Sequence, residues 1–129
     1  MRRALNEIVS RRVLVVDDEL LIAMDMEQIL LDLGAQVVGP ATTLSLALQL
    51  ATTEQIDCAV LDVNLGDNVS VGPVVDTLRA RHIPFVLATG YGKNAPITLS
   101  KSYPWISKPF TRDSIESALR AAFEAQGQT

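Results

Sequence analysis

Several short apolar runs in this sequence end at residues that can bind a cation or a phosphate. These residues are Asp17, Asp18, Asp62, Thr89 and Lys108. Carboxylates without accompanying histidine or cysteine ligands favour a hard ion such as Mg²⁺ over zinc. A lysine ammonium and a threonine hydroxyl can each bind a phosphate oxygen. The combination is suited to placing a phosphoryl group on a carboxylate, with Asp62 as the nucleophile.

Each of these acids also has a purely structural interpretation. Asp17 and Asp18 could cap the N-terminus of a following helix, and Asp62 could sit in an Asx turn. For any one of them the two interpretations are equally good. Because polar residues end several runs in the same way, the coincidence favours a shared site.

The elements that must position these residues follow the pattern of a parallel sheet covered by helices, since apolar runs alternate with segments of helical periodicity. We predict five strands, over Arg12–Val16, Gln36–Gly39, Cys58–Leu61, Phe85–Ala88 and Trp105–Ser107. Helices are predicted over Glu19–Leu33, after Thr43, from about Gly72, and from about Thr111 or Asp113. The helix expected within Gly90–Ser100 should be short or irregular, because Gly90, Gly92 and Pro96 disfavour it.

The order of the strands decides whether the acids meet. In a sheet of order 2-1-3-4-5 the first and third strands are neighbours, and ligands bind outside the carboxyl ends of the strands. Asp17, Asp18 and Asp62 should then converge within a few ångströms of one another. Three like charges so close require a counter-ion, for which Mg²⁺ is the expected choice.

Length and composition fit one α/β domain. The chain has 129 residues, 48% hydrophobic and 20% charged, an ordinary globular composition. We predict a single domain over 1–129, with a core over about 12–125, an N-terminal extension over 1–10 and a tail over 126–129. The net charge of −4 argues against nucleic-acid binding, and no apolar run is long enough to span a membrane. A cytoplasmic location is expected, and Cys58, in an apolar run, should be an inert core residue.

Four motifs carry a resemblance to a known family. They are Val-Val-Asp-Asp-Glu at 15–19, Leu-Asp at 61–62, Ala-Thr-Gly at 88–90 and Ser-Lys-Pro-Phe at 107–110. In order and spacing the chain resembles the receiver domains of two-component response regulators. The sequence at 84–91 is similar to an alphaproteobacterial single-domain subgroup named for a Phe-Ala-Thr-Gly-Tyr motif, although Leu87 stands in place of its phenylalanine. The resemblance implies a flavodoxin-like (βα)5 three-layer sandwich.

The resemblance also implies an aspartyl-phosphate switch and its metal ligands. The phosphoryl group would come from a sensor histidine kinase or a phosphotransfer protein onto Asp62. Asp18 and Asp62 would ligate Mg²⁺ through their side chains, the backbone carbonyl of Asn64 would complete the protein ligands, and Asp17 would act through water. A downstream protein partner is implied without being identified, and a homodimer is compatible with the family.

The remaining roles concern the phosphate and the change of conformation. By the resemblance, Thr89 and Lys108 would contact the phosphate, and Trp105 occupies the position of an aromatic switch that moves together with Thr89. For Trp105, static packing at the sheet edge is an equally good interpretation. We predict that Tyr91 overhangs the phosphate and slows its hydrolysis.

Two other functions stay open at this point. The first is a phosphohydrolase of the haloacid dehalogenase type, which also uses an aspartate at a strand end with Mg²⁺. It is disfavoured because its Asp-x-Asp motif follows the first strand, whereas Asp62 follows the third and Asn64 replaces the second aspartate, so a general acid is missing. The second is a degenerate receiver that only binds partners. It is disfavoured because every residue of the expected phosphate site is present. In the favoured interpretation the protein is a regulatory phosphoacceptor and not an enzyme.

Overall fold

The sheet of this protein has five parallel strands in the order β2-β1-β3-β4-β5. The computed structural model describes residues 8–63, 65, 69–89, 105–107 and 110–127. The strands are β1 (Arg12–Val16), β2 (Gln36–Ala41), β3 (Cys58–Asp62), β4 (Phe85–Thr89) and β5 (Trp105–Ser107). The helices in the described part are α2 (Leu20–Asp32), α3 (Leu44–Thr53), α4 (Gly72–Ala80) and α6 (Arg112–Gly127). The predicted sheet order is confirmed.

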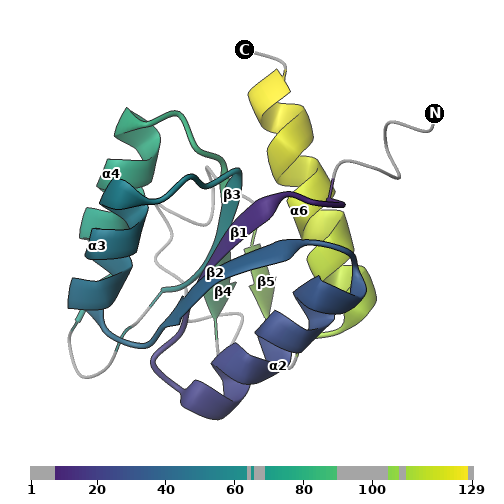
Figure 1. Ribbon diagram of the computed structural model, residues 1–129, viewed down its shortest axis with the longest axis horizontal. Helices are drawn as coiled ribbons and strands as arrows, with labels where there is room; N and C mark the ends of the chain where they lie inside the picture. Colours follow the sequence, from purple (N-terminus) through teal and green to yellow (C-terminus); the bar gives the residue numbers. More distant parts are fainter. Residues whose placement is uncertain (1–7, 64, 66–68, 90–104, 108–109, 128–129) are drawn as a thin grey trace.

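The helices form layers on the two faces of the sheet, with α3 and α4 on one side and α2 and α6 on the other (Figure 1). Alternation along the strands supplies both cores, because successive strand residues point to opposite faces. On β1, Leu14 and Val16 belong to the core under α3 and α4, while Val13 and Val15 belong to the core under α2 and α6. A sheet buried on both faces explains why its strands are almost continuously apolar.

Local signals set the ends of two helices. Thr43 begins α3 by accepting a hydrogen bond from the backbone N–H of Leu46 at 3.2 Å. At the start of α6, the Thr111 Oγ1 accepts from the Ser114 N–H at 3.0 Å, and the Ser114 Oγ accepts from the Thr111 N–H at 3.1 Å. These contacts satisfy backbone donors that the helix itself leaves without a partner.

The second strand differs from its predicted range. The predicted strand ends at Gly39, but β2 continues to Ala41. Leu14 pairs with Val38 and Val16 pairs with Ala41, so β2 contains one more residue than β1 over this stretch. The extra residue forms a β-bulge, which lets the strand pass Pro40 and resume pairing.

Two further findings concern the ends of the chain. Ile8 is buried in the core under α2 and α6, so the residues just before β1 pack against the domain. The last helix runs to Gly127, which reaches into the segment predicted as a tail. No helix in the described ranges is long and apolar enough to cross a membrane. The helix predicted within 90–100 lies outside the described residues.

Candidate metal and phosphoacceptor site

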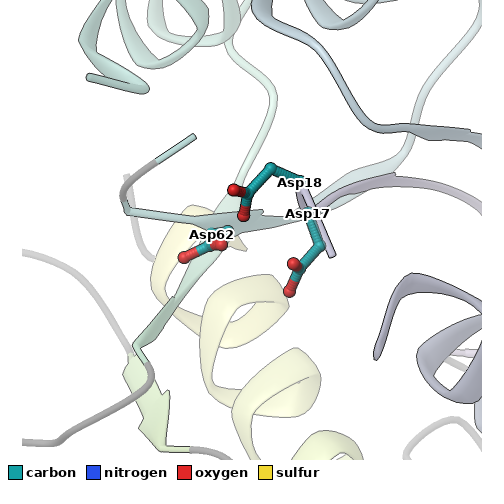
Figure 2. A group of neighbouring side chains, drawn as sticks. All are labelled: Asp17, Asp18 and Asp62. Atoms are coloured by element: carbon teal, nitrogen blue, oxygen red, sulfur yellow. The ribbon is translucent and has the colours of Figure 1, made fainter. Parts of the chain in front are cut away.

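Three carboxylates from two neighbouring strands meet at the carboxyl end of the sheet. Asp17 and Asp18 directly follow β1, and Asp62 is the last residue of β3. Figure 2 shows the three side chains gathered where the two strands end. One oxygen of each carboxylate lies within 4.8 Å of the corresponding oxygens of the other two. We call Asp17, Asp18 and Asp62 the acidic cluster; its convergence was predicted from the sequence.

Asp17 is held in place through its backbone and its side chain. Its N–H donates to the carbonyl of Ala41 at 3.0 Å, which fastens the end of β1 to the end of β2. Its Oδ1 accepts from the N–H of Glu19 at 2.9 Å. No capping hydrogen bond from a side chain is recorded at the N-cap of α2, which is Glu19. The Asp17 side chain therefore stabilises the turn before α2 and does not cap the helix itself.

Asp62 is positioned by the middle strand of the sheet. β3 pairs with β1 on one side and with β4 on the other. Beyond Asp62, the N–H of Val63 donates to the carbonyl of Ala88 at 3.0 Å, so the chain stays attached to β4 where it leaves the strand. Only 6% of Asp62 is exposed, whereas Asp18 is exposed. A carboxylate fixed in this way varies little in position, whereas the exposed carboxylate of Asp18 is accessible to ions in solution.

The donor set fits a hard divalent cation. All three groups are carboxylates, and two of them, Asp17 and Asp62, are buried. Placing buried carboxylates side by side is unfavourable because their like charges repel at short range in a medium less polar than water. A bound Mg²⁺ would offset this repulsion, since it prefers a few carboxylate oxygens and retains several waters.

The other predicted site residues are only partly described. The backbone of Thr89 ends β4 and pairs with Ser107, which ends β5, so both lie at the same edge of the sheet as the acidic cluster. Lys108, Asn64 and Tyr91 lie outside the described residues. Trp105 begins β5 and is 43% exposed, so its indole is not packed into either core.

The lone thiol takes no part in this site. Cys58 is at the opposite end of β3 from Asp62 and is fully buried. Burial, reinforced by the charge of Asp57, raises the pKa of the Cys58 thiol to about 12. A thiol with such a pKa stays protonated near neutral pH and is a poor nucleophile.

Sequence reasoning missed the part of β2 that supports Asp17. The carbonyl that holds the Asp17 N–H belongs to Ala41, beyond the predicted end of the strand. A signal was present in Gly39-Pro40-Ala41, because glycine in a strand often marks a bulge. The pairing register that reveals the bulge becomes visible only in three dimensions.

Comparison with known proteins agrees with this geometry. Residues 13–120 match the family model of the response regulator receiver domain. The phyllosphere-induced regulator PhyR of Methylorubrum extorquens is 30% identical over 124 residues, which are 93% of this chain and 46% of that protein. The chain thus spans about half the length of the curated relatives it matches.

Solved structures give the same result. The solution structure of SdrG from Sphingomonas melonis Fr1 matches with a TM-score of 0.79 and 38% identity, over 90% of this chain and 98% of that one. A PhyR mutant from Bartonella quintana, described as an anti-anti-sigma factor, matches with a TM-score of 0.80 and 28% identity. That match covers 99% of this chain and 54% of the other.

Proposed function

The chain belongs to the response-regulator receiver family, and on this premise we propose that it is a phosphorylation-dependent signalling switch that carries its phosphoryl group on Asp62. The observation that supports this most is the acidic cluster at the carboxyl ends of β1 and β3. The family is regulatory, so the chemistry of the site serves to change binding to other proteins and not to turn over a metabolite.

The proposed transfer uses the carboxylate of Asp62 as the nucleophile. One of its oxygens forms a bond to phosphorus while the bond between phosphorus and the donor atom breaks, and the donor atom leaves with the electron pair. The nucleophile is the ionised form of Asp62, whose oxygen supplies the electron pair of the new bond, so no proton moves in this step. The burial of Asp62 and the pairing of β3 support this role, because they restrict the position of the carboxylate.

The proposed cofactor is Mg²⁺. Bound Mg²⁺ would neutralise the negative charge that accumulates when a phosphoryl group approaches carboxylates. Asp18 and Asp62 would hold it through their side chains, Asp17 through water and Asn64 through its backbone carbonyl. The closeness of the three carboxylates supports the side-chain part of this set. The contribution of Asn64 rests on the family resemblance alone.

The proposed switch operates at the adjacent ends of β4 and β5. Thr89 and Lys108 would bind phosphate oxygens, Tyr91 would restrict water, and Trp105 would change position together with Thr89. Support comes from the backbone, because Thr89 and Ser107 pair at the edge where the acidic cluster lies. A charge-assisted hydrogen bond contributes roughly 1.5 to 3 kcal/mol, and a nearly complete population reversal requires about 5.5 kcal/mol. Two such contacts barely suffice, so partner binding should complete the change.

The proposed phosphodonor is a protein, namely a sensor histidine kinase or a phosphotransfer protein, and the proposed location is the cytoplasm. The outer surface of α2 supports a protein donor, because Leu20, Leu21 and Met24 are exposed on its first two turns, 58%, 81% and 51% respectively. Apolar side chains gathered beside a reactive site are typical of protein interaction surfaces. Asp18 and Asp25 are exposed nearby, so a donor with basic residues around its own apolar surface would fit.

Downstream, the proposed output is a change in affinity for another protein. A net charge of −4 does not favour binding to nucleic acid, because both would be negatively charged. Relatives called PhyR include one described as an anti-anti-sigma factor, which makes a partner in transcriptional control one candidate. Because the chain covers only about half of those relatives, their partners are not assigned to it directly.

The decisive experiment uses acetyl phosphate with Mg²⁺ and measures the mass of the intact protein. We expect the mass of one phosphoryl group to be added, and we expect Asp62→Asn to abolish the addition. Asp57→Asn is the matched control, because Asp57 precedes the same strand at the other end of the sheet. Sustained hydrolysis of phosphoesters would indicate the hydrolase instead. If the protein is neither labelled nor able to hydrolyse phosphoesters, the remaining interpretation is a receiver that acts by binding alone.

A further inference from the structure

One residue of β2 lies in a conformation that side chains rarely adopt. Gly39 has a φ of +97° and lies within the β-bulge, where the pairing of β1 with β2 shifts between Leu14 and Val16. In this region of conformational space a Cβ atom collides with the backbone, so glycine is strongly favoured. The bulge therefore depends on glycine at this position.

A side chain at residue 39 would also press on both strands. A Cβ atom there would lie 2.8 Å from the backbone N of Ala41 and 3.2 Å from the carbonyl O of Val15. The Ala41 N belongs to β2 itself, so that contact can be relieved only by a change in the backbone of the bulge. The Val15 O belongs to β1, so relief of the second contact requires the two strands to move apart next to the pairing of Ala41 with Val16. The next contact along the pair is the hydrogen bond from the Asp17 N–H to the Ala41 carbonyl, at 3.0 Å.

We propose that Gly39 is a positioning residue for the acidic cluster. By allowing the bulge, it brings the Ala41 carbonyl to the Asp17 N–H and fixes the direction in which the buried Asp17 leaves β1. Asp17 is followed at once by Asp18, so the same contact sets the position of both acids relative to Asp62. This inference rests on the proposed function, because the consequence of the positioning is the affinity for Mg²⁺.

The test compares two glycine substitutions. Gly39→Ala should raise the dissociation constant for Mg²⁺ by about tenfold, the scale seen when residues that orient metal ligands are changed. Gly34→Ala is the matched control, because Gly34 also has a positive φ, +92°, and its added Cβ would lie 3.2 Å from Val9 Cγ2. It precedes β2 at the amino end of the sheet, away from the cluster. It should lower stability while leaving Mg²⁺ affinity unchanged.

Affinity is measured by titrating the folded proteins with Mg²⁺ alone and following amide NMR shifts well below each melting temperature. If Gly39→Ala binds like the unaltered protein, or if both variants weaken binding equally, the positioning role is wrong. If the unaltered protein itself fails to bind Mg²⁺, the proposed function is wrong instead. Should Gly39→Ala not fold, Gly39→Asn replaces it, because asparagine tolerates positive φ better but still introduces the Cβ contact.

A measurement on the unaltered protein supplements the variants. If Mg²⁺ binding and the Asp17 hydrogen bond are coupled, the coupling is reciprocal, so Mg²⁺ should slow hydrogen exchange at the Asp17 amide. The amide of Gln36 is the control, since it donates to the Arg11 carbonyl at 2.8 Å at the far end of the same strand pair. Equal slowing at the two amides would contradict the proposal.

Discussion

The charged side chains are arranged differently at the two ends of the sheet. At the amino end, acidic and basic side chains are paired: the Arg12 guanidinium lies 3.2 Å from Glu54, and the Arg11 guanidinium lies 3.9 Å from Asp57. The Asp57 carboxylate also accepts a hydrogen bond from the backbone N–H of Arg12 at 2.9 Å. The Arg11 guanidinium also lies over the ring of Phe123, 5.3 Å from its centre. At the carboxyl end, the acidic cluster gathers carboxylates from two strands.

The difference separates charges that stabilise the fold from charges for which we propose a function. Partly exposed pairs of opposite sign add modestly to stability, and at the amino end they tie the start of β1 to the segment before β3. Carboxylates brought together oppose folding, which agrees with the proposed role of the acidic cluster in binding Mg²⁺. Removing a charge should therefore have opposite effects at the two ends.

The largest effect is expected at the carboxyl end, from Asp18→Ala. Loss of this carboxylate should weaken Mg²⁺ affinity by at least about tenfold, because it removes a proposed ligand. Without Mg²⁺, the free energy of unfolding should stay constant or rise, since one of the neighbouring like charges is gone. The measurements are Mg²⁺ titration and urea denaturation. Asp25→Ala, an exposed acid on α2, is the control and should change neither; a large loss of stability in Asp18→Ala would break the contrast.

An intermediate effect is expected at the amino end, from Arg12→Ala. The Arg12 Nε donates to the Gln55 carbonyl at 2.6 Å and Nη2 donates to Glu54 at 3.2 Å. Losing these contacts should lower the free energy of unfolding by about 1 to 2 kcal/mol, because the group is only partly buried. Mg²⁺ affinity should not change. Arg79→Ala, at an exposed position of α4, controls for the loss of a positive charge; equal destabilisation by both variants would show that the contacts of Arg12 matter little.

The smallest effect near neutral pH is expected at Cys58, which begins the strand that Asp62 ends. With its pKa raised from 9.0 to about 12 by burial, the thiol should resist alkylation at pH 8 in the folded protein and react after unfolding. The folded state favours the protonated thiol, so its contribution to stability is full below pH 9 and is lost as the pH rises towards 12. Rapid alkylation of the folded protein at pH 8 would contradict the burial.

Much of this contrast could be predicted from the sequence. The alternation of apolar runs and helices predicted a parallel sheet, and the order 2-1-3-4-5 of a flavodoxin-like fold predicted that Asp17, Asp18 and Asp62 would meet. The extension of β2 to Ala41 was not predicted, because a glycine in a strand only suggests a bulge and the register that establishes it depends on pairing with β1. The contacts of Arg12 also escaped prediction, since they join residues more than 40 positions apart.

The central claim is that Asp62, and no other carboxylate of the acidic cluster, accepts the phosphoryl group. The most direct measurement is to treat the protein with acetyl phosphate and Mg²⁺, reduce the acyl phosphate with borohydride, and sequence the peptides by mass spectrometry. The account predicts homoserine at position 62, formed only in the presence of Mg²⁺. Homoserine at position 17 or 18, or an unmodified residue 62 in a labelled protein, would contradict it.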